Sequence, residues 1–344
     1  MKMTTVTLED SDAPCFSHES FLAPPAVEKQ PSGIKSPHRH RSPARRWNGD
    51  GKGIQVDIGT RLREYVDCLN NSKWNVIGNH LADELTRNGH SQTREEHITR
   101  LQGRTKGLAG FNIKIDTMLV DKKARAVAAR YVNRMTLVDE RVNADPVEKT
   151  IEFDEQCFVW FNEKGKISRI VTIQDNDGIR AQNPTAEMTP KFLTRSMPDK
   201  PVDLGSLYRA YVISMNQRTM KTEFPKFCRK DLRHNNRPFT VQDYARNLDM
   251  SHEVVSGLHF EIKELLVDEE TQQVAARLEL TGTPTSMFAG IPPNGKSIKF
   301  NEHCMYRFDK GKISVVWATM ELDVVRKQLE ARADRRKSSM LGIN

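Results

Sequence analysis

The chain has 344 residues and a formal net charge of +8, with 37% hydrophobic and 28% charged residues. This composition is typical of globular proteins, and the length allows roughly two domains of about 150 residues each. No window approaches the roughly 18 to 20 consecutive apolar residues of a membrane span, and the N-terminus carries acids where a secretory signal has its apolar core. We therefore expect a soluble cytoplasmic protein without a membrane partner, with the nucleus as the alternative location.

The first 55 residues lack apolar periodicity and are rich in Ser, Pro, His and Arg. Such a segment cannot bury enough surface to offset its chain entropy, so we predict a disordered basic tail over 1–55. Its basic run SPHRHRSPARRW has two interpretations: a solvated tail without a role, or a nuclear-import or phosphorylation segment. A second basic tail is predicted over 331–344.

The positive charge is concentrated at the two ends of the chain. Residues 1–55 have a net charge of +2 and residues 324–344 one of +4, which leaves +2 for all the residues between them. A fold that binds nucleic acid gathers positive charge on its own surface. A DNA or RNA partner is therefore not expected.

The sequence between the tails repeats. Four pairs of blocks match, at an offset of 147 residues for the first three and 146 for the last: Leu119-Val120-Asp121 with Leu266-Val267-Asp268, Val127-Ala128-Ala129-Arg130 with Val274-Ala275-Ala276-Arg277, Phe153-x-Glu155-x-Cys157-x-x-x-Phe161 with Phe300-x-Glu302-x-Cys304-x-x-x-Phe308, and Gly165-Lys166-Ile167-Ser168 with Gly311-Lys312-Ile313-Ser314. This constant register predicts a tandem duplication. We assign domains to 56–183 and 204–330, joined by a proline-containing linker over 184–203.

Each copy is predicted to begin with helices and to end with strands. Apolar residues at three- and four-residue spacing predict helices over 61–70 and 206–215, each followed by a short helical stretch before Leu85 or Leu232. Third helical segments follow over 93–101 and 240–248, and alternation then predicts strands in the first copy over 111–115, 126–132, 153–161 and 167–173. Helices followed by an antiparallel meander predict an α+β unit, in which a curved sheet wraps against the helices and leaves a pocket.

The octapeptide Gly290 to Ser297 (GIPPNGKS) has the spelling of a P-loop. A P-loop needs a preceding strand of a parallel sheet and a following helix whose amides bind phosphate. Here residues 298–308 alternate as a strand, and Pro292 and Pro293 remove two amide donors. We interpret the segment as a hairpin connection between two strands.

Metal and cofactor chemistry is not indicated by the remaining motifs. The five cysteines are odd in number and never in CxxC spacing, which predicts neither a disulfide framework nor a zinc site. The histidines show no ligand spacing of a known metal site. No metal and no cofactor is therefore expected.

Two carboxylates remain as candidates for acid/base chemistry. Asp175 follows the strand predicted over 167–173, and Glu321 occupies the matching place in the second copy. At the mouth of an apolar pocket the charged form of such a group is disfavoured, so its pKa rises and it can exchange a proton near neutral pH. The alternative is a solvated acid that caps the last strand. Asp177 and Asp323 match in register too, so the acid can be either member of each pair.

The second copy resembles the SnoaL-like polyketide cyclase family, which belongs to the nuclear transport factor 2-like fold superfamily. The matching positions are Gly282-Thr283, Phe288, Gly290, Pro292-Pro293, Gly295, Arg307-Phe308, Gly311-Lys312-Ile313, Trp317 and Gln328-Leu329. The resemblance covers 282–330, and the repeat extends it to 60–182. It implies two tandem cone-shaped α+β barrels of the nuclear transport factor 2-like type, each with a hydrophobic cavity.

The resemblance also implies an activity. In these cyclases an aspartate acts as acid and base in an intramolecular aldol closure without a cofactor, and its position is that of Glu321 in the second copy and of Asp175 in the first. The second copy departs from the pattern by having Glu for Asp. The first has Val171 where the family often has Trp, and it lacks the GT-x-x-G-x-F-x-G-x-P-P hairpin.

Two hypotheses follow. The first is a cofactor-independent cyclase or isomerase whose partner is a small hydrophobic, carbonyl-bearing secondary metabolite, derived from a polyketide or a terpenoid. Asp175 and Glu321 would then be catalytic, with Trp317, His303 and Tyr306 as candidate pocket residues. His303 and Tyr306 have opposite strand parity, so at most one of them points inward.

The second hypothesis is a non-enzymatic module that binds a ligand or another protein. Related single domains commonly dimerise through their sheets, so a fused pair would form an intramolecular pseudo-dimer, with a homo-oligomer as the alternative.

Overall fold

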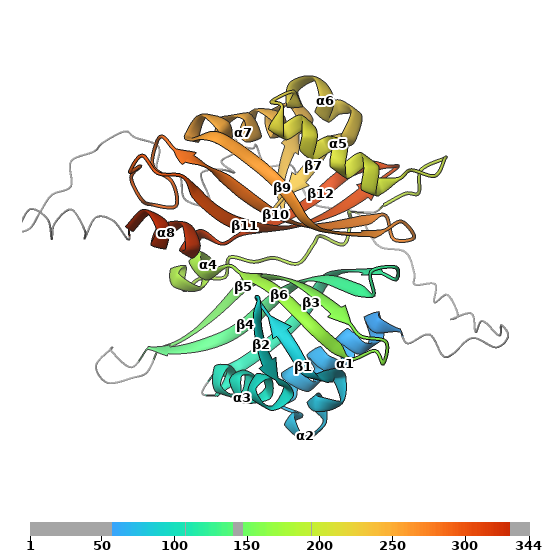
Figure 1. Cartoon of the computed structure of the whole chain (residues 1–344), viewed down its shortest axis with the longest axis vertical. Helices are drawn as coiled ribbons and strands as arrows, with labels where there is room; N and C mark the ends of the chain where they lie inside the picture. Colours follow the sequence, from blue (N-terminus) through green and yellow to red (C-terminus); the bar gives the residue numbers. More distant parts are fainter. Residues whose placement is uncertain (1–56, 107, 140–146, 194, 331–344) are drawn as a thin grey trace, which may run out of the picture.

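The structure is a computed structural model that describes residues 57–106, 108–139, 147–193 and 195–330. The predicted tails over 1–55 and 331–344 lie outside these residues. The described chain forms two tandem α+β domains with nearly the same succession of elements, stacked so that their sheets face each other (Figure 1).

Domain 1 places its first helices before a six-stranded sheet. Its elements are α1 (Ile58–Asn70), α2 (Trp74–Ile77), η2 (Gly78–His80), β1 (Leu81–Arg87), β2 (His90–Thr93), α3 (Arg94–Thr105), β3 (Ala109–Asp121), β4 (Ala126–Asp139), β5 (Val147–Phe161), β6 (Ile167–Gln174) and α4 (Asn176–Ala181). The strand order is β2-β1-β6-β5-β4-β3. β1 runs parallel to β6, and the other neighbours are antiparallel.

Domain 2 repeats this plan. Its elements are α5 (Leu204–Asn216), α6 (Met220–Phe227), β7 (Cys228–His234), β8 (Arg237–Thr240), α7 (Val241–Val254), β9 (Val255–Asp268), β10 (Gln273–Pro284), β11 (Ile298–Asp309), β12 (Lys312–Met320) and α8 (Leu322–Glu330). The order β8-β7-β12-β11-β10-β9 is that of the first sheet, with β7 parallel to β12. The GIPPNGKS segment joins β10 to β11, so its interpretation as a hairpin connection is confirmed.

The predicted α+β class is confirmed, with two corrections. Each sheet is an open, mixed, six-stranded sheet with two edge strands, and not a closed barrel or a purely antiparallel meander. The short first hairpin of each sheet was not predicted. Its turn in domain 1 is Asn88-Gly89, with φ angles of 47° and 82°. Positive φ at both central residues is the requirement of a type I′ hairpin, for which Asn-Gly is the strongest sequence signal.

The helices begin at side-chain caps that the repeat preserves. Asp57 accepts a hydrogen bond from the Thr60 amide at the start of α1, and Asp203 accepts one from the Ser206 amide at the start of α5. Thr93 forms a capping box at the start of α3. Each cap satisfies an amide that has no partner inside its helix, which contributes about 1 kcal/mol.

The two sheets pack against each other through a shared apolar core. Its buried members are Leu119, Ala126, Ala128 and Phe158 from domain 1 and Leu266, Ala275, Met305, Val315 and Trp317 from domain 2. Hydrogen bonds flank this core symmetrically: the Val120 amide donates to Asp268 at 3.3 Å, and the Val267 amide donates to Asp121 at 3.1 Å. Because residues 147 positions apart exchange roles in these bonds, an approximate two-fold axis relates the domains.

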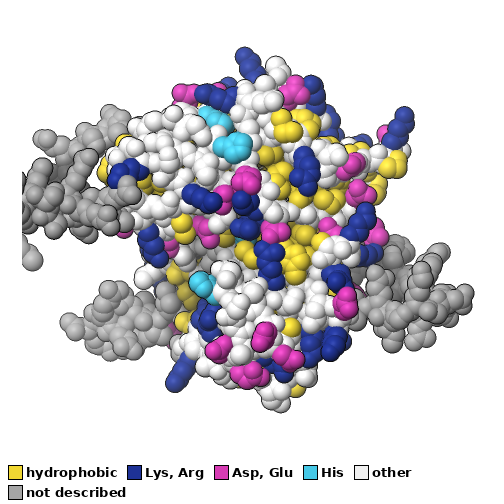
Figure 2. Space-filling view, viewed as in Figure 1, with side chains coloured by type: hydrophobic (Ala, Val, Ile, Leu, Met, Phe, Trp, Pro, Cys, Tyr) yellow, Lys and Arg dark blue, Asp and Glu magenta, His cyan; other side chains and the backbone are white. Residues whose placement is uncertain are grey.

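A second reciprocal contact joins α4 to α8. Arg180 pairs with Asp323 at 2.8 Å, and Arg326 pairs with Asp177 at 2.6 Å. Lys/Arg and Asp/Glu side chains are interspersed over both domains on the face that Figure 2 shows. None of the helices in the described ranges is long and apolar enough to cross a membrane.

Candidate functional site

The inner face of the first sheet borders a cavity of about 290 Å³ beneath helices α1 and α3. Most of its wall is apolar and includes Val66, Leu69, Leu101, Phe111, Ile113 and Phe153. Strand alternation on β5 places Phe153, Glu155, Cys157 and Val159 on this face, whereas Phe158 points into the core between the sheets. An apolar pocket with a few convergent polar groups is the usual form of a small-molecule site.

Glu155 is the carboxylate of this cavity. It accepts hydrogen bonds from Thr172 Oγ1 at 2.6 Å and from Asn133 Nδ2 at 2.9 Å. The guanidinium of Arg87 lies 4.0 Å from it, and both side chains are 13% exposed. A carboxylate in an apolar wall persists when it is hydrogen-bonded and paired. These partners therefore fix the direction in which Glu155 points.

The phenol of Tyr65 also lines the cavity and contacts the buried His97, which in turn contacts the buried Gln92. Tyr65 Oη lies 3.1 Å from His97 Nε2, and Gln92 Nε2 lies 2.9 Å from His97 Nδ1. Burial, reinforced by nearby arginines, lowers the pKa of His97 to about 4, so its ring is neutral at pH 7. With the Gln92 amide donating to Nδ1, the ring proton is on Nε2 and is donated to Tyr65. The hydroxyl proton of Tyr65 is then available to a ligand.

The corresponding region of domain 2 is occupied by aromatic rings. Tyr208, Tyr211, Phe224, Tyr244 and Tyr306 contact one another, with ring centroids 4.9 Å apart for Tyr208 and Tyr306 and 5.6 Å apart for Phe224 and Tyr244. The partners of Glu155 are also missing there. Ala318 stands at the position of Thr172, and Leu280 at that of Asn133. Domain 2 thus lacks the groups that orient the carboxylate of domain 1.

Glu302 is the counterpart of Glu155 in domain 2. Burial raises its pKa from 4.5 to about 7, and a hydrogen bond with Cys304 opposes the shift. The groups that face it, Cys304, Tyr208 and Tyr244, are neutral because burial raises their pKa values well above the ordinary ones. The folded protein therefore binds a proton at Glu302 that the unfolded chain releases near pH 4.5.

This difference predicts a pH dependence of stability. The protonated Glu302 contributes roughly 3 kcal/mol to the free energy of unfolding. This contribution is complete below about pH 4.5 and is lost as the pH rises through 7. We expect Glu302→Gln to unfold at a higher urea concentration than the wild type at pH 8 and at nearly the same concentration at pH 4.5. A difference between the two proteins that does not change with pH would contradict this prediction.

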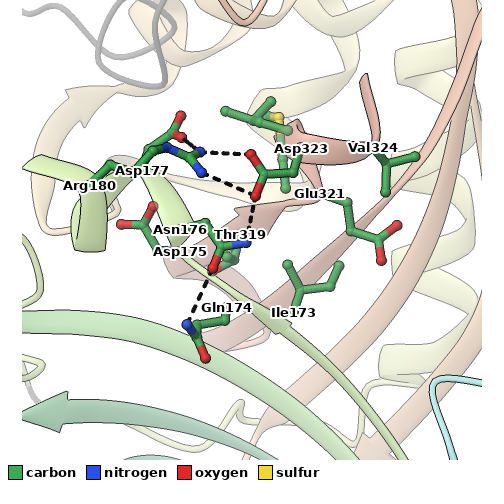
Figure 3. Close-up of a pocket in the computed structure, with 12 residues that line it drawn as sticks. Ile173, Gln174, Asp175, Asn176, Asp177, Arg180, Thr319, Glu321, Asp323 and Val324 are labelled. Atoms are coloured by element: carbon green, nitrogen blue, oxygen red, sulfur yellow. Dashed lines mark hydrogen bonds and ion pairs between the residues drawn. The ribbon is translucent and has the colours of Figure 1, made fainter. Parts of the chain in front are cut away.

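The acids predicted from the sequence lie elsewhere. Asp175 caps α4 by accepting from the Gly178 amide at 2.9 Å, and Glu321 accepts from Asn301 Nδ2 at 2.7 Å. Both line a small pocket of about 140 Å³ at the domain junction, where their carboxylates point away from each other (Figure 3). Neither lines the apolar cavity of domain 1. Asp175 therefore lies outside the cavity between sheet and helices beside which it is expected, and the catalytic role of both acids stays a prediction.

The two alternative acids are held in ion pairs at the same junction. Asp323 accepts from Arg180, whose hydrogen bond lowers the pKa of Asp323 to about 2 even though burial opposes the shift. Arg326 donates to both oxygens of Asp177, at 2.8 and 2.6 Å. These contacts join α4 to α8.

His303 and Tyr306 point to opposite faces of the sheet, as expected from their strand parity. Tyr306 faces the interior of domain 2, where it contacts Tyr208. His303 faces the other domain: its Nδ1 lies 3.0 Å from the Gln156 carbonyl, and burial lowers its pKa to about 3. Trp317 lies between the sheets, with its ring centroid 3.5 Å from the Arg130 guanidinium. None of the three lines the cavity of domain 1.

A larger cleft of about 560 Å³ opens between the domains. Its lining includes Arg130, Asp154, Asp175, Asn235 and Trp317. Its wall mixes charged and amide side chains with apolar ones, and its buried charges are engaged with one another: Arg130 pairs with Asp154 at 2.7 Å. The cavity of domain 1 differs in having an apolar wall with a single carboxylate.

Glu155 is not among the acids predicted from the sequence, although the sequence contains a signal for it. In the repeated pattern Phe-x-Glu-x-Cys, period-two alternation places Glu155 on the same face as Phe153 and Cys157. A carboxylate on an otherwise apolar strand face indicates a polar group inside the core. Arg87, Tyr65 and His97 carried no comparable pattern, because they come from three different elements.

Known proteins are similar to the chain over the length of about one domain. The model of the SnoaL-like polyketide cyclase family matches residues 205–329. A SnoaL-like polyketide cyclase from Agrobacterium tumefaciens is 33% identical, with 37% of this chain and 97% of that chain covered and a TM-score of 0.35. TsrD from Streptomyces laurentii is 17% identical, with 37% and 93% covered and a TM-score of 0.34.

IdmH from Streptomyces antibioticus is 16% identical, with 38% of this chain and 99% of that chain covered and a TM-score of 0.34. No curated protein matches the chain significantly. The matched segment runs from the start of α5 to the last turn of α8, so it covers the whole of domain 2. On the family model and the 33% identity to the Agrobacterium protein, the chain belongs to the SnoaL-like polyketide cyclase family.

Proposed function

We propose that the protein is a cofactor-independent cyclase or isomerase that acts on a hydrophobic, carbonyl-bearing metabolite in the cavity of domain 1. The observation that carries this proposal is Glu155, an oriented carboxylate in the wall of an apolar cavity, within a chain of a polyketide cyclase family. A polyketide or terpenoid-derived substrate fits the apolar wall.

In this proposal Glu155 and Tyr65 have complementary roles. Glu155 removes a proton from the carbon next to a carbonyl group, while Tyr65 donates a hydrogen bond to the carbonyl oxygen as negative charge develops there. The resulting carbon nucleophile attacks a second carbonyl of the same molecule, or it is reprotonated at another position. The proton taken by Glu155 returns to the product, so neither route needs an oxidant or a cofactor.

The neutral state of Tyr65 supports its role as a donor. Burial raises its pKa well above the ordinary value of 10. His97, fully buried and neutral, holds the phenol in place through the 3.1 Å contact. Thr172 and Asn133 hold the base in the same way. Reacting groups that are held before the substrate arrives lower the entropic cost of reaching the transition state.

Domain 2 fits the second hypothesis better. Its interior is occupied by contacting aromatic rings, and its sheet packs on the sheet of domain 1. We propose that it serves as a non-enzymatic partner that covers the outer sheet face of domain 1. Asp175 and Glu321, which lie at the junction, remain the alternative catalytic pair.

Metabolite profiling of the source organism distinguishes these proposals. The gene would be deleted and then restored as wild type, Glu155→Gln, Glu302→Gln, Asp175→Asn or Glu321→Gln. We expect the deletion to accumulate an uncyclised or unisomerised precursor that every version except Glu155→Gln removes. Failure of Asp175→Asn or Glu321→Gln instead would move the active site to the domain junction. A deletion without an accumulating precursor would favour the non-enzymatic module for the whole chain.

A further inference from the structure

Arg104 lines the cavity of domain 1 without an acidic partner among the described residues. It lies in the last turn of α3, its side chain is exposed at the rim of the cavity, and its Nη2 donates to Gln174 Oε1 at 2.9 Å. The other arginine of the cavity, Arg87, lies beside Glu155 at 4.0 Å. A guanidinium has five N–H donors in a planar fork, which suits two parallel hydrogen bonds to a carboxylate. The contact with Gln174 leaves most of these donors available.

The charges that line the cavity leave one positive charge in excess. Its charged side chains are Arg87, Arg104 and Glu155. The other titratable groups of the wall are neutral at pH 7: burial raises the pKa of Cys157 to about 12 and raises those of Tyr65 and Tyr131 above the ordinary value. The pair of Arg87 with Glu155 is internally balanced, so Arg104 carries the excess.

We infer that the ligand of this cavity is an amphipathic carboxylate, with its apolar body against the inner wall and its carboxylate on Arg104. The inference rests on the proposed function, because it takes the cavity of domain 1 as the ligand site. A single unpaired cation matches one negative charge, whereas a phosphate monoester carries up to two. At about 290 Å³ the cavity lies near the lower end of the usual range for ligand pockets, which favours a body of about two rings.

A pair of probes with the same rings and different charge tests this inference. Isothermal titration calorimetry would measure the binding of 2-naphthoate and of 2-naphthamide to the full chain at low salt. The variants are Arg104→Gln and, as a matched control, Arg100→Gln. Arg100 lies one turn earlier on α3 and is exposed, as Arg104 is, but it does not line the cavity. Thermal unfolding would establish that both variants are folded.

We expect the wild type to bind 2-naphthoate about two- to fivefold more tightly than 2-naphthamide, as is typical of a charge-assisted hydrogen bond at an exposed rim. The preference should disappear in Arg104→Gln and persist in Arg100→Gln. Three results would overturn the inference and leave the proposed function standing. They are equal affinities of the wild type for the two probes, a preference that survives in Arg104→Gln, and a loss of preference in Arg100→Gln equal to that in Arg104→Gln. Failure of both probes to bind would overturn the cavity as a ligand site, and the proposed function with it.

Discussion

Replacement of Arg130 by methionine is expected to lower the free energy of unfolding by about 3 to 5 kcal/mol. Arg130 is 1% exposed, and its Nη1 pairs with Asp116 at 2.7 Å. Its Nε lies 2.7 Å from Asp154 in an ion pair without hydrogen-bond alignment, and its guanidinium carbon lies 3.5 Å from the centroid of the Trp317 ring. Without the cation, two largely buried carboxylates lose their counter-charge at the junction of the domains. Urea unfolding at pH 7 measures the loss.

The repeat supplies the control for this prediction. Arg277 is the counterpart of Arg130, but its side chain is 19% exposed, and it contacts Asn301 at 2.9 Å and Glu264 at 3.9 Å. We expect Arg277→Met to cost about 1 kcal/mol or less. Equal losses in the two variants would show that the buried ion pairs of Arg130 do not determine the effect.

The deficit of Arg130→Met should also shrink as the pH falls from 7 to about 4.5. Burial already raises the pKa of Asp154 in the wild type, although Arg130 opposes the shift. Removal of Arg130 raises this pKa further, so the folded variant takes up protons that the unfolded chain does not hold. We therefore expect Arg130→Met to gain stability relative to the wild type when the solution is acidified. A deficit that grows on acidification would contradict the assignment.

The second large effect is expected at Glu155. Glu155→Gln keeps the shape of the side chain and can keep its contacts with Thr172 and Asn133, but it cannot accept a proton at catalytic rates. We expect kcat on the precursor that accumulates in the deletion strain to fall by about 10²- to 10⁴-fold with little change in KM. Steady-state kinetics with the purified full chain provides the measurement.

Glu302→Gln is the matched control for that experiment. The two residues occupy the same place in the repeated Phe-x-Glu-x-Cys pattern, and Glu302 is buried in the interior of domain 2. Its replacement should leave kcat within about threefold of the wild type at pH 7. A large loss in Glu302→Gln together with a small one in Glu155→Gln would place catalysis in domain 2.

The repeat predicted most of the fold because it constrains both copies at once. Blocks at a fixed offset require the same elements in the same order, and β3 to β6 confirm the four strands predicted in the first copy. The first hairpin was missed because β1 and β2 are short, and the Asn88-Gly89 turn was not used as a signal. The parallel pairing of β1 with β6 joins segments about 85 residues apart, which local patterns do not reveal.

The site was harder to predict because both faces of each sheet are buried. On β5, Phe153 and Cys157 point to the helices while Phe158 points to the other domain, so apolar residues occur at both parities. When one face is solvated, alternation identifies the inner face; here it does not. Asp175 and Glu321 were consequently expected beside the cavity, although they follow strands whose corresponding face turns towards the domain junction.

The side chains that contact Glu155 show a second reason why the site could not be predicted from the sequence. Thr172, Asn133 and Arg87 come from β6, β4 and β1, and they meet only because the sheet order places β6 between β5 and β1. Divergence between the copies was visible in the sequence, where Thr172 and Asn133 correspond to Ala318 and Leu280. The sequence does not show that the diverged positions surround one carboxylate in domain 1 and an aromatic cluster in domain 2. The structure shows both arrangements, because it brings these strands together.

The most direct test of the central claim is a crystal structure of Glu155→Gln with the accumulated precursor bound. This variant should bind the precursor without converting it. We predict electron density in the cavity of domain 1, with a carbonyl oxygen within hydrogen-bond distance of Tyr65 Oη and the reacting carbon beside residue 155. Density at the domain junction beside Asp175 or Glu321, with the cavity of domain 1 free of precursor, would contradict the claim.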